Sequence, residues 1–348
     1  MQVPENQSLP AHREWIVSVS PHVKSNETVA KIMWTVVACL MPPLFLSVFI
    51  FGFQVLIITA VSVVSCVAVE YVSQKSLGRP VTITDGSAVL TGVLLAFLIP
   101  PGVSYLLPVL GAVMAIYIAK HLFGGIGFNI FNPALMGRAF LLATFPVAMT
   151  SAWLPPVEGL AIFSYFGAGV DAVSTATPLA VMKEQGMVAF TEMFGSGASL
   201  YTSFFLGWRP GCIGETSGFL LVLGGAYLIY KNYITWHTPV AVLGTIATLT
   251  WIFGGESYFG GDPLLAILSG GAILGSIYMA TDYVTSPTTK TGQLVYGVGI
   301  GALTVLIRLK GGYPEGICYA ILLMNPLASV IDNFCKPKRF AGPAGGDK

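Results

Sequence analysis

Apolar stretches long enough to cross a lipid bilayer recur along this chain and leave it few ways to fold in water. A hydrocarbon core of about 30 Å requires roughly 20 apolar residues in a helix. The longer windows are Ala30–Val48, Ile50–Val72, Leu106–Leu122, Gly218–Tyr230, Val240–Phe253, Gly292–Ile307 and Pro314–Val330. Shorter or interrupted runs are Ser87–Ile99, Pro133–Met149 and Pro263–Ala280. The pattern predicts an all-α polytopic membrane protein with about ten transmembrane helices.

Composition supports this fold class and excludes several functions. The 348 residues are 54% hydrophobic and only 9% charged, whereas soluble domains carry about 25% charged residues. A net charge of +1 offers no basic surface, so no nucleic-acid partner is expected. The five cysteines form no Cys-x-x-Cys pair, and His121 and His237 lack partners at ligand spacing, so no metal site built from this chain alone is expected, while a cluster shared between subunits stays open. Without a Walker loop, a Gly-x-Gly-x-x-Gly strand motif or a nucleophile elbow, the chain should neither bind NAD nor catalyse hydrolysis alone.

Lysine and arginine positions predict the orientation of the chain in the membrane, because cytoplasmic segments carry an excess of these residues. With an even helix count and a cytoplasmic N-terminus, 12 of them fall inside and 4 outside, while Arg138 lies within an apolar run. Both termini should therefore be cytoplasmic. The expected divisions are a cytoplasmic N-terminal segment (1–29), a first five-helix half (30–150), an extracytoplasmic loop (151–217), a second five-helix half (218–331) and a cytoplasmic tail (332–348).

The two halves are weakly similar to each other. Asp85-Gly-Ser-Ala-Val-Leu-Thr-Gly opens a short apolar run in the first half, and Gly261-Asp-Pro-Leu-Leu-Ala-Ile-Leu-Ser-Gly270 opens its counterpart. Short, broken apolar segments at matching positions are typical of inverted repeats, in which unwound backbone lines a polar cavity. We therefore expect two related sets of five helices that include discontinuous helices. The motifs Gly271-x-x-x-Gly275 and Gly297-x-x-x-Gly301 allow close helix packing.

Polar residues gather beside glycine and proline breaks in both halves. Polar and ionisable groups near lipid normally face a partner, a cavity or water. Oxygen-rich side chains beside unwound backbone suit the passage of Na⁺ or H⁺, and the alternative for each residue is a helix cap or a contact with another subunit. The ion-pathway candidates are Asp282, Thr285, Asn129, Asn132 and Asp85.

One long polar segment separates the two halves, and the aromatic residues interleaved through positions 163–208 predict a folded cap there. Within it, Thr177 precedes Pro178, a pattern typical of a helix N-cap with proline at the first helical position. About two helical turns should follow and end at Gly186. The same geometry also favours a phosphate, so it fits either a simple helix cap or a phosphorylated ligand esterified to the threonine. Elsewhere, Arg138 or Arg209 could pair with a phosphate or a carboxylate through two parallel hydrogen bonds.

Ser174-x-Ala176-Thr177, preceded by Asp171, resembles the covalent flavin-attachment site of one family of membrane flavoprotein subunits. These subunits occur in Rnf-type ferredoxin:NAD oxidoreductases and Na⁺-translocating NADH:quinone reductases. The chain departs from the related soluble-domain flavoprotein subunit at Ala180, where that subunit tends to have Ser or Thr. Four further segments are similar to the family's D-type subunit, and together they cover most of the chain: Ser20–Ser25, Gly124–Arg138, Gly207–Ser217 and Met279–Thr289.

The resemblance implies an integral membrane subunit of an Rnf-type complex in a bacterial or archaeal cytoplasmic membrane. It implies FMN held as a phosphoester on Thr177, with Asp171, Ser174, Ala176 and Pro178 completing the attachment motif, and a bound riboflavin whose residues the sequence does not indicate. The implied partners are a second covalent flavoprotein subunit, small integral membrane subunits, and subunits that contact ferredoxin and NAD. The chain would relay electrons between ferredoxin and NAD, in a reaction coupled to Na⁺ or H⁺ translocation, and would not be active alone.

Two alternatives stay open from the sequence. The membrane subunit of Na⁺-translocating NADH:quinone reductase shares the motif, although the leader of roughly thirty residues, short for that subunit, favours the Rnf type. A channel or secondary transporter for a small solute fits the broken-helix pattern equally well. Flavin that survives denaturation would indicate the redox subunit, and a colourless chain would indicate the transporter.

Overall fold

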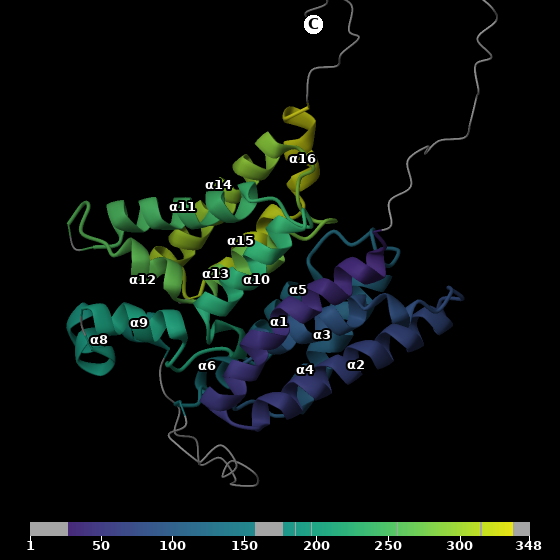
Figure 1. Ribbon diagram of the computed structural model, residues 1–348, viewed down its shortest axis with the longest axis horizontal. Helices are drawn as coiled ribbons and strands as arrows, with labels where there is room; N and C mark the ends of the chain where they lie inside the picture. The colour runs from purple at the N-terminus through teal and green to yellow at the C-terminus, as the bar shows by residue number, and fades with distance from the viewer. Residues whose placement is uncertain are drawn as a thin grey trace, which may run out of the picture.

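The described chain folds almost entirely into helices. The computed structural model describes residues 27–156, 177–184, 186–195, 197–255, 257–313 and 315–336 (Figure 1). No strand occurs in these ranges. The all-α membrane fold expected from the sequence is therefore confirmed.

The first half begins with two long helices and continues with shorter ones. Its elements are α1 (Val29–Phe51), α2 (Gln54–Ser76), η1 (Ile83–Asp85), α3 (Ser87–Phe97), α4 (Leu106–Ala112), the π-helix η2 (Val113–His121), α5 (Pro133–Thr144) and α6 (Pro146–Ser151). Thr28 caps α1, because its side chain accepts a hydrogen bond from the Lys31 amide at 3.2 Å. Asn132 caps α5 in the same way, and Pro133 occupies the first helical position. The polar residues around Asn132 thus lie at the start of a helix, as the Asn-Pro pair indicates.

The second half repeats this order with more breaks. Its elements are α10 (Gly218–Tyr230), α11 (His237–Phe253), α12 (Pro263–Leu268), α13 (Ala272–Leu274), the π-helix η5 (Gly275–Met279), α14 (Lys290–Lys310), α15 (Ile317–Met324) and α16 (Ala328–Phe334). Asp262 caps α12 ahead of Pro263, and the chain unwinds between α12 and α13. α15 and α16 form a pair bent by 55°. Interrupted helices of this kind leave backbone carbonyls free for other partners.

Short helices lie between the two halves: α7 (Pro178–Glu184), α8 (Gly186–Phe194), α9 (Ala198–Leu206) and η4 (Ile213–Glu215). Phe190, Phe194 and Phe204 pack together with ring centroids 5.3 to 6.1 Å apart. α9 also contacts α12, where the Tyr201 hydroxyl donates to the Asp262 carboxylate at 2.5 Å. In Figure 1, α8 and α9 lie at one end of the bundle, and α16 lies away from them.

The two halves pack in matching ways. α2 lies against α3, α4 and η2, and α11 correspondingly lies against α12 and α14. α1 contacts α10, and α5 contacts α15, so each of these elements meets its counterpart between the halves. Counterparts meet in this way where two repeats are related by a two-fold axis.

Helix lengths show how far the membrane pattern is interrupted. Among the described helices, α1, α2 and α14 are each long and apolar enough to span a bilayer, and the bent pair of α15 and α16 makes a fourth if it counts as one span. The other apolar helices are shorter, including α3, α10 and α11. Short and broken helices are the discontinuous elements that the sequence predicts.

Candidate functional site

Thr177 stands at the start of α7 and is nearly buried, with 5% of its surface exposed. Its Oγ1 accepts a hydrogen bond from the Ala180 amide at 3.3 Å, and its carbonyl accepts one from the Val181 amide at 3.0 Å. The helix cap expected from Thr177 and Pro178 is therefore present. Outside the described residues lie Asp171, Ser174 and Ala176.

The surroundings of Thr177 are unusually charged for a buried site. It lines a small cleft where α7 meets the chain breaks beside η4, α12 and α15. The other residues that line this cleft are Pro178, Leu179, Arg209, Glu215, Ser269, Gly270 and Glu315. A threonine hydroxyl from the segment between the halves thus lies among ionisable groups that come from elsewhere in the chain.

Two arginines bind the carbonyls that are freed where α12 ends. Arg209 donates to the Leu268 carbonyl at 2.5 Å. Arg308 donates to the Ala266 and Ser269 carbonyls at 2.7 and 2.9 Å. The Nε atoms of both guanidinium groups are buried and have no hydrogen-bond partner among the described residues. Both side chains therefore keep donor capacity that an anion could use.

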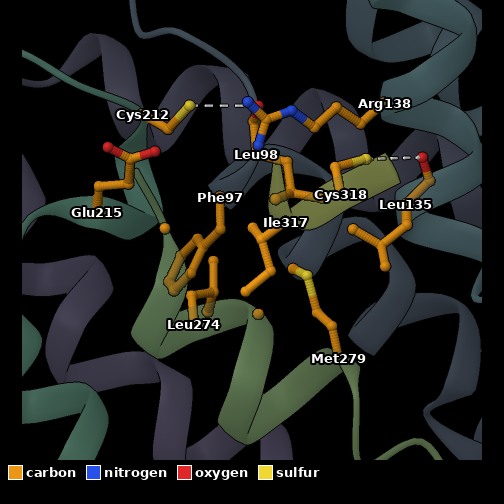
Figure 2. Close-up of a pocket in the computed structure, with 12 residues that line it drawn as sticks. Phe97, Leu98, Leu135, Arg138, Cys212, Glu215, Leu274, Met279, Ile317 and Cys318 are labelled. Atoms are coloured by element: carbon orange, nitrogen blue, oxygen red, sulfur yellow. Dashed lines mark hydrogen bonds between the residues drawn. The ribbon is translucent and has the colours of Figure 1, made fainter. Parts of the chain in front are cut away.

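A third arginine connects the two halves. Arg138 of α5 forms an ion pair with Glu315, which lies just before α15. Figure 2 shows that Arg138, Cys212 and Glu215 line the same small pocket. Arg138, Arg209 and Arg308 all act electrostatically on the Glu215 carboxylate. We refer to Arg138, Arg209, Arg308, Glu215 and Glu315 as the charge cluster.

The charge cluster favours an anion over a cation. The Cys212 thiol and the carboxylates of Glu215 and Glu315 each place one oxygen or sulfur atom within 4.8 Å of the others, a spacing that could hold a metal ion. The neighbouring guanidinium groups already neutralise these carboxylates, however, and they repel a second cation. With every group ionised, three arginines and two glutamates leave one positive charge. Burial, followed by the nearby Glu315 carboxylate, raises the pKa of Glu215 to about 7, and a proton on Glu215 adds to this positive charge.

Most ion-pathway candidates gather at a junction between the two halves. The Asp282 carboxylate accepts a hydrogen bond from the Thr285 hydroxyl at 3.1 Å and one from the Asn129 side chain. Asn132 donates to the Met279 carbonyl at 3.3 Å, at the end of η5. These contacts bring together residues that are about 150 positions apart in the chain. We refer to Asn129, Asn132, Asp282 and Thr285 as the junction cluster.

Asp85 stands apart from the junction cluster, at the end of η1. Its Oδ1 accepts hydrogen bonds from the Ser87 amide at 2.8 Å and from the Ser87 hydroxyl at 2.7 Å. Ser87 also accepts a hydrogen bond from Lys120, which leads into a third group of polar side chains.

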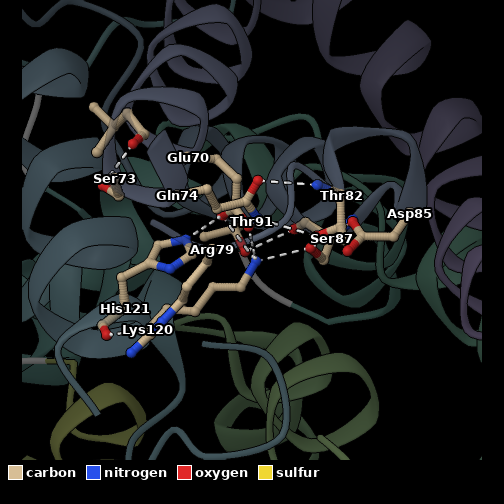
Figure 3. A network of polar contacts seen from close by, with 11 residues as sticks. Glu70, Ser73, Gln74, Arg79, Thr82, Asp85, Ser87, Thr91, Lys120 and His121 are labelled. Carbon is tan, nitrogen blue, oxygen red and sulfur yellow. Dashed lines mark hydrogen bonds and ion pairs between the residues drawn. The ribbon is translucent and has the colours of Figure 1, made fainter. Parts of the chain in front are cut away.

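This third group is one that sequence reasoning missed. Glu70 of α2 converges with Lys120 and His121 of η2 at the end of α2, and all three are at most 3% exposed (Figure 3). Glu70 and Lys120 are 50 residues apart, so no local spacing announces their contact. The available signal was a carboxylate inside the apolar window Ile50–Val72. Arg308 and Glu315 were likewise not anticipated as site residues, because each looks like a surface charge near a helix end.

Known proteins align with nearly the whole chain. Residues 16–341 match the model of the NQR2, RnfD, RnfE family. The chain is 50% identical over 325 residues to the D subunit of the proton-translocating ferredoxin:NAD(+) oxidoreductase complex of Clostridium ljungdahlii, covering 93% of this chain and 95% of that protein. It is 44% identical to the D subunit of the Na(+)-translocating ferredoxin:NAD(+) oxidoreductase complex of Acetobacterium woodii, with 92% and 94% covered. It is also 40% identical to the D subunit of the ion-translocating oxidoreductase complex of Rhodobacter capsulatus, with 86% and 88% covered. The chain therefore belongs to the NQR2, RnfD, RnfE family.

Proposed function

We propose that this chain is the D subunit of an Rnf-type complex and relays electrons between ferredoxin and NAD through FMN esterified to Thr177. The observation that carries the cofactor assignment is the buried position of Thr177 in a cleft shared with Arg209. The assignment to an Rnf-type complex is supported by relatives that align with nearly the whole chain and are named as subunits of ferredoxin:NAD(+) oxidoreductase complexes. The NADH:quinone reductase alternative has no comparable support among these relatives.

The residues around Thr177 fit a phosphate ester. An esterified phosphate keeps one negative charge, which matches the single positive charge in excess on the charge cluster. The unpartnered Nε–H groups of Arg209 and Arg308 can donate to phosphate oxygens. Esterification removes only the hydroxyl hydrogen of Thr177, so its oxygen can still accept from the Ala180 amide. When bound, FMN supplies one- and two-electron transfer, while the protein sets its position and potential.

The remaining parts of this proposal concern ions and partners. The junction cluster supplies a carboxylate, a hydroxyl and two amides where the halves meet, a set of oxygen ligands that suits Na⁺ or H⁺. The partners would be a second covalent flavoprotein subunit and small integral membrane subunits, and riboflavin would be a second flavin. The membrane would be the cytoplasmic membrane of a bacterium or archaeon, with both termini inside.

Peptide mass analysis tests the flavin assignment. The chain is expressed with its flavin-attaching enzyme, and the peptide that covers residues 171–183 is examined for an FMN adduct. We expect the adduct in the wild type, its loss in Thr177→Ala and partial retention in Thr177→Ser. Thr175→Ala is the matched control, because it removes a neighbouring hydroxyl, and it should keep the adduct. An adduct that persists in Thr177→Ala would place the flavin on another residue and refute Thr177 as the attachment site, and a wild-type chain without flavin would refute covalent FMN on this chain.

A further inference from the structure

A buried network at the end of α2 holds more titratable groups than helix packing requires. The Lys120 ammonium donates to both carboxylate oxygens of Glu70 at 2.9 Å and to the Ser87 hydroxyl at 2.8 Å. Gln74 donates to Glu70 at 2.9 Å. Nε2 of His121 lies 3.2 Å from the same carboxylate. Figure 3 shows these side chains converging on Glu70.

His121 has spare capacity for a proton. Its ring is 2% exposed, and neither ring nitrogen has a well-aligned hydrogen-bond partner among the described residues. Both ring nitrogens are therefore buried without a hydrogen-bond partner in the described part of the chain, a costly arrangement unless it serves a function. Glu70 and Lys120 form a buried pair of opposite charges, and the His121 ring lies beside the same carboxylate.

The network also reaches partly exposed groups. Ser87 accepts from Lys120 and donates at 2.7 Å to Asp85, which is partly exposed. Hydrogen bonds thus run without a gap from Asp85 through Ser87 and Lys120 to Glu70, and His121 follows at 3.2 Å. The other ionisable groups at this site are Arg79, which donates to the His121 carbonyl at 3.1 Å, and the Cys66 thiol.

The second half shows that the fold does not need this network. There the matching seam between α11 and α14 is closed by glycines: a Cβ atom on Gly297 would lie 2.6 Å from that of Ala241, and one on Gly301 would lie 2.6 Å from that of Thr245. Buried ion pairs rarely stabilise a protein more than apolar packing does. Because stability alone does not account for Glu70, Lys120 and His121, these buried ionisable groups in a membrane protein point to a function.

From these observations we propose that Glu70, Lys120 and His121 form a proton-loading site for ion translocation, connected to the surface through Ser87 and Asp85. Lys120 passes a proton to Glu70, and Glu70 passes it to an unprotonated Nε2 of His121, which then carries the loaded proton. Water protonates Asp85, and Asp85 passes this proton to Ser87 as the Ser87 hydroxyl proton returns Lys120 to its ammonium form.

The proton balance of this relay closes. One proton enters from water at Asp85 and one proton is added at His121, while Asp85, Ser87, Lys120 and Glu70 regain their starting charges. The proposal rests on the part of the proposed function in which the complex translocates ions, and it names H⁺ as the ion at this site.

The test uses the whole complex in sealed vesicles, with electron transfer from ferredoxin to NAD as the driving reaction. A pH-sensitive dye reports protons, and radioactive sodium reports Na⁺. We expect His121→Gln and Glu70→Gln to lower the protons moved per electron by about tenfold or more, because neither variant side chain can carry a proton. FMN on Thr177 and the subunit composition should be unchanged. Thr304→Val is the matched control, because it removes a buried hydroxyl from the α14 seam, and it should translocate like the wild type.

A charge swap separates the relay from a structural ion pair. Glu70→Lys combined with Lys120→Glu keeps a pair of opposite charges but takes the ammonium away from Ser87, so translocation should stay low. Full translocation in the swap, or in His121→Gln, would overturn the proposal, as would a wild-type complex that moves Na⁺ and no protons. A wild-type chain without FMN would refute the flavin assignment alone, because the proton measurements in His121→Gln do not depend on how the flavin is held.

Discussion

At the scale of single residues, loss of a charge should affect ion translocation in the junction cluster and stability in the charge cluster. Asp282 is held by neutral donors, whereas Glu315 is paired with Arg138. Removing the charge from the first site takes away the carboxylate that we propose attracts a cation, and removing a charge from the second leaves its partner buried without compensation.

Replacing Asp282 should therefore affect translocation more than folding. Asp282→Asn keeps the shape of the side chain and a hydrogen bond from Thr285, but it removes the charge that attracts a cation. We expect ion movement per electron to fall by about tenfold or more, with normal FMN content. Asp332→Asn is the control, because Asp332 binds the amides of Thr288 and Thr289 at the start of α14 and should affect stability alone. Normal pumping by Asp282→Asn would reduce Asp282 to a capping residue.

The ion pair of Arg138 and Glu315 should show the opposite behaviour. Glu315→Leu leaves Arg138 buried without its partner, which should lower the free energy of unfolding by about 3–5 kcal/mol. The double variant Arg138→Met with Glu315→Leu removes both charges and should recover most of that loss. Thermal unfolding of the purified chain in detergent measures both effects. A double variant no more stable than Glu315→Leu would contradict this account of the pair.

At the scale of helices, α11 and α14 pack closely because glycines in α14 have no side chain at the contact. A methyl group added to Gly297 would lie 3.0 Å from the Thr238 carbonyl oxygen and 2.6 Å from the Cβ atom of Ala241. Gly297→Ala should therefore force the helices apart and cost about 1–3 kcal/mol of unfolding free energy. Gly244→Ala is the control on the facing helix, because nothing lies within 4 Å of the added methyl group. Equal stability of the two variants would show that α11 and α14 do not pack closely.

Helix starts could be predicted from the sequence, and contacts between distant helices could not. Asn132 before Pro133, and Thr177 before Pro178, act over three or four residues, so the local pattern carries all the information that the cap needs. The π-helix η2 and the pair of Glu70 with Lys120 depend on how α2 lies against η2. The sequence named Arg138 or Arg209 as a candidate partner for a phosphate or a carboxylate, and it missed Arg308, whose contacts depend on the carbonyls freed at the end of α12.

At the scale of the whole molecule, the predicted orientation has the widest consequences, because it decides on which side of the membrane Thr177 and its proposed flavin lie. The excess of lysine and arginine at one end predicts that α7 faces outward. A cysteine placed at the exposed residue Glu184 should react with an impermeant thiol reagent on intact cells. Cys335, near the C-terminus, should react only after the membrane is opened. The reverse labelling would invert the topology.

The contacts of α1 with α10 and of α5 with α15 bear on how the chain arose. Contacts between counterparts are what we would expect if two copies of one ancestral half, paired as a symmetric homodimer, had been fused into one chain. A true homodimer would carry every interface contact twice. The bond of Arg138 with Glu315 has no such twin, because the residues at the same offsets from the starts of α15 and α5 are the apolar Leu322 and Phe131. The present chain is thus committed to its fusion, and two copies of either half could no longer rebuild the charge cluster.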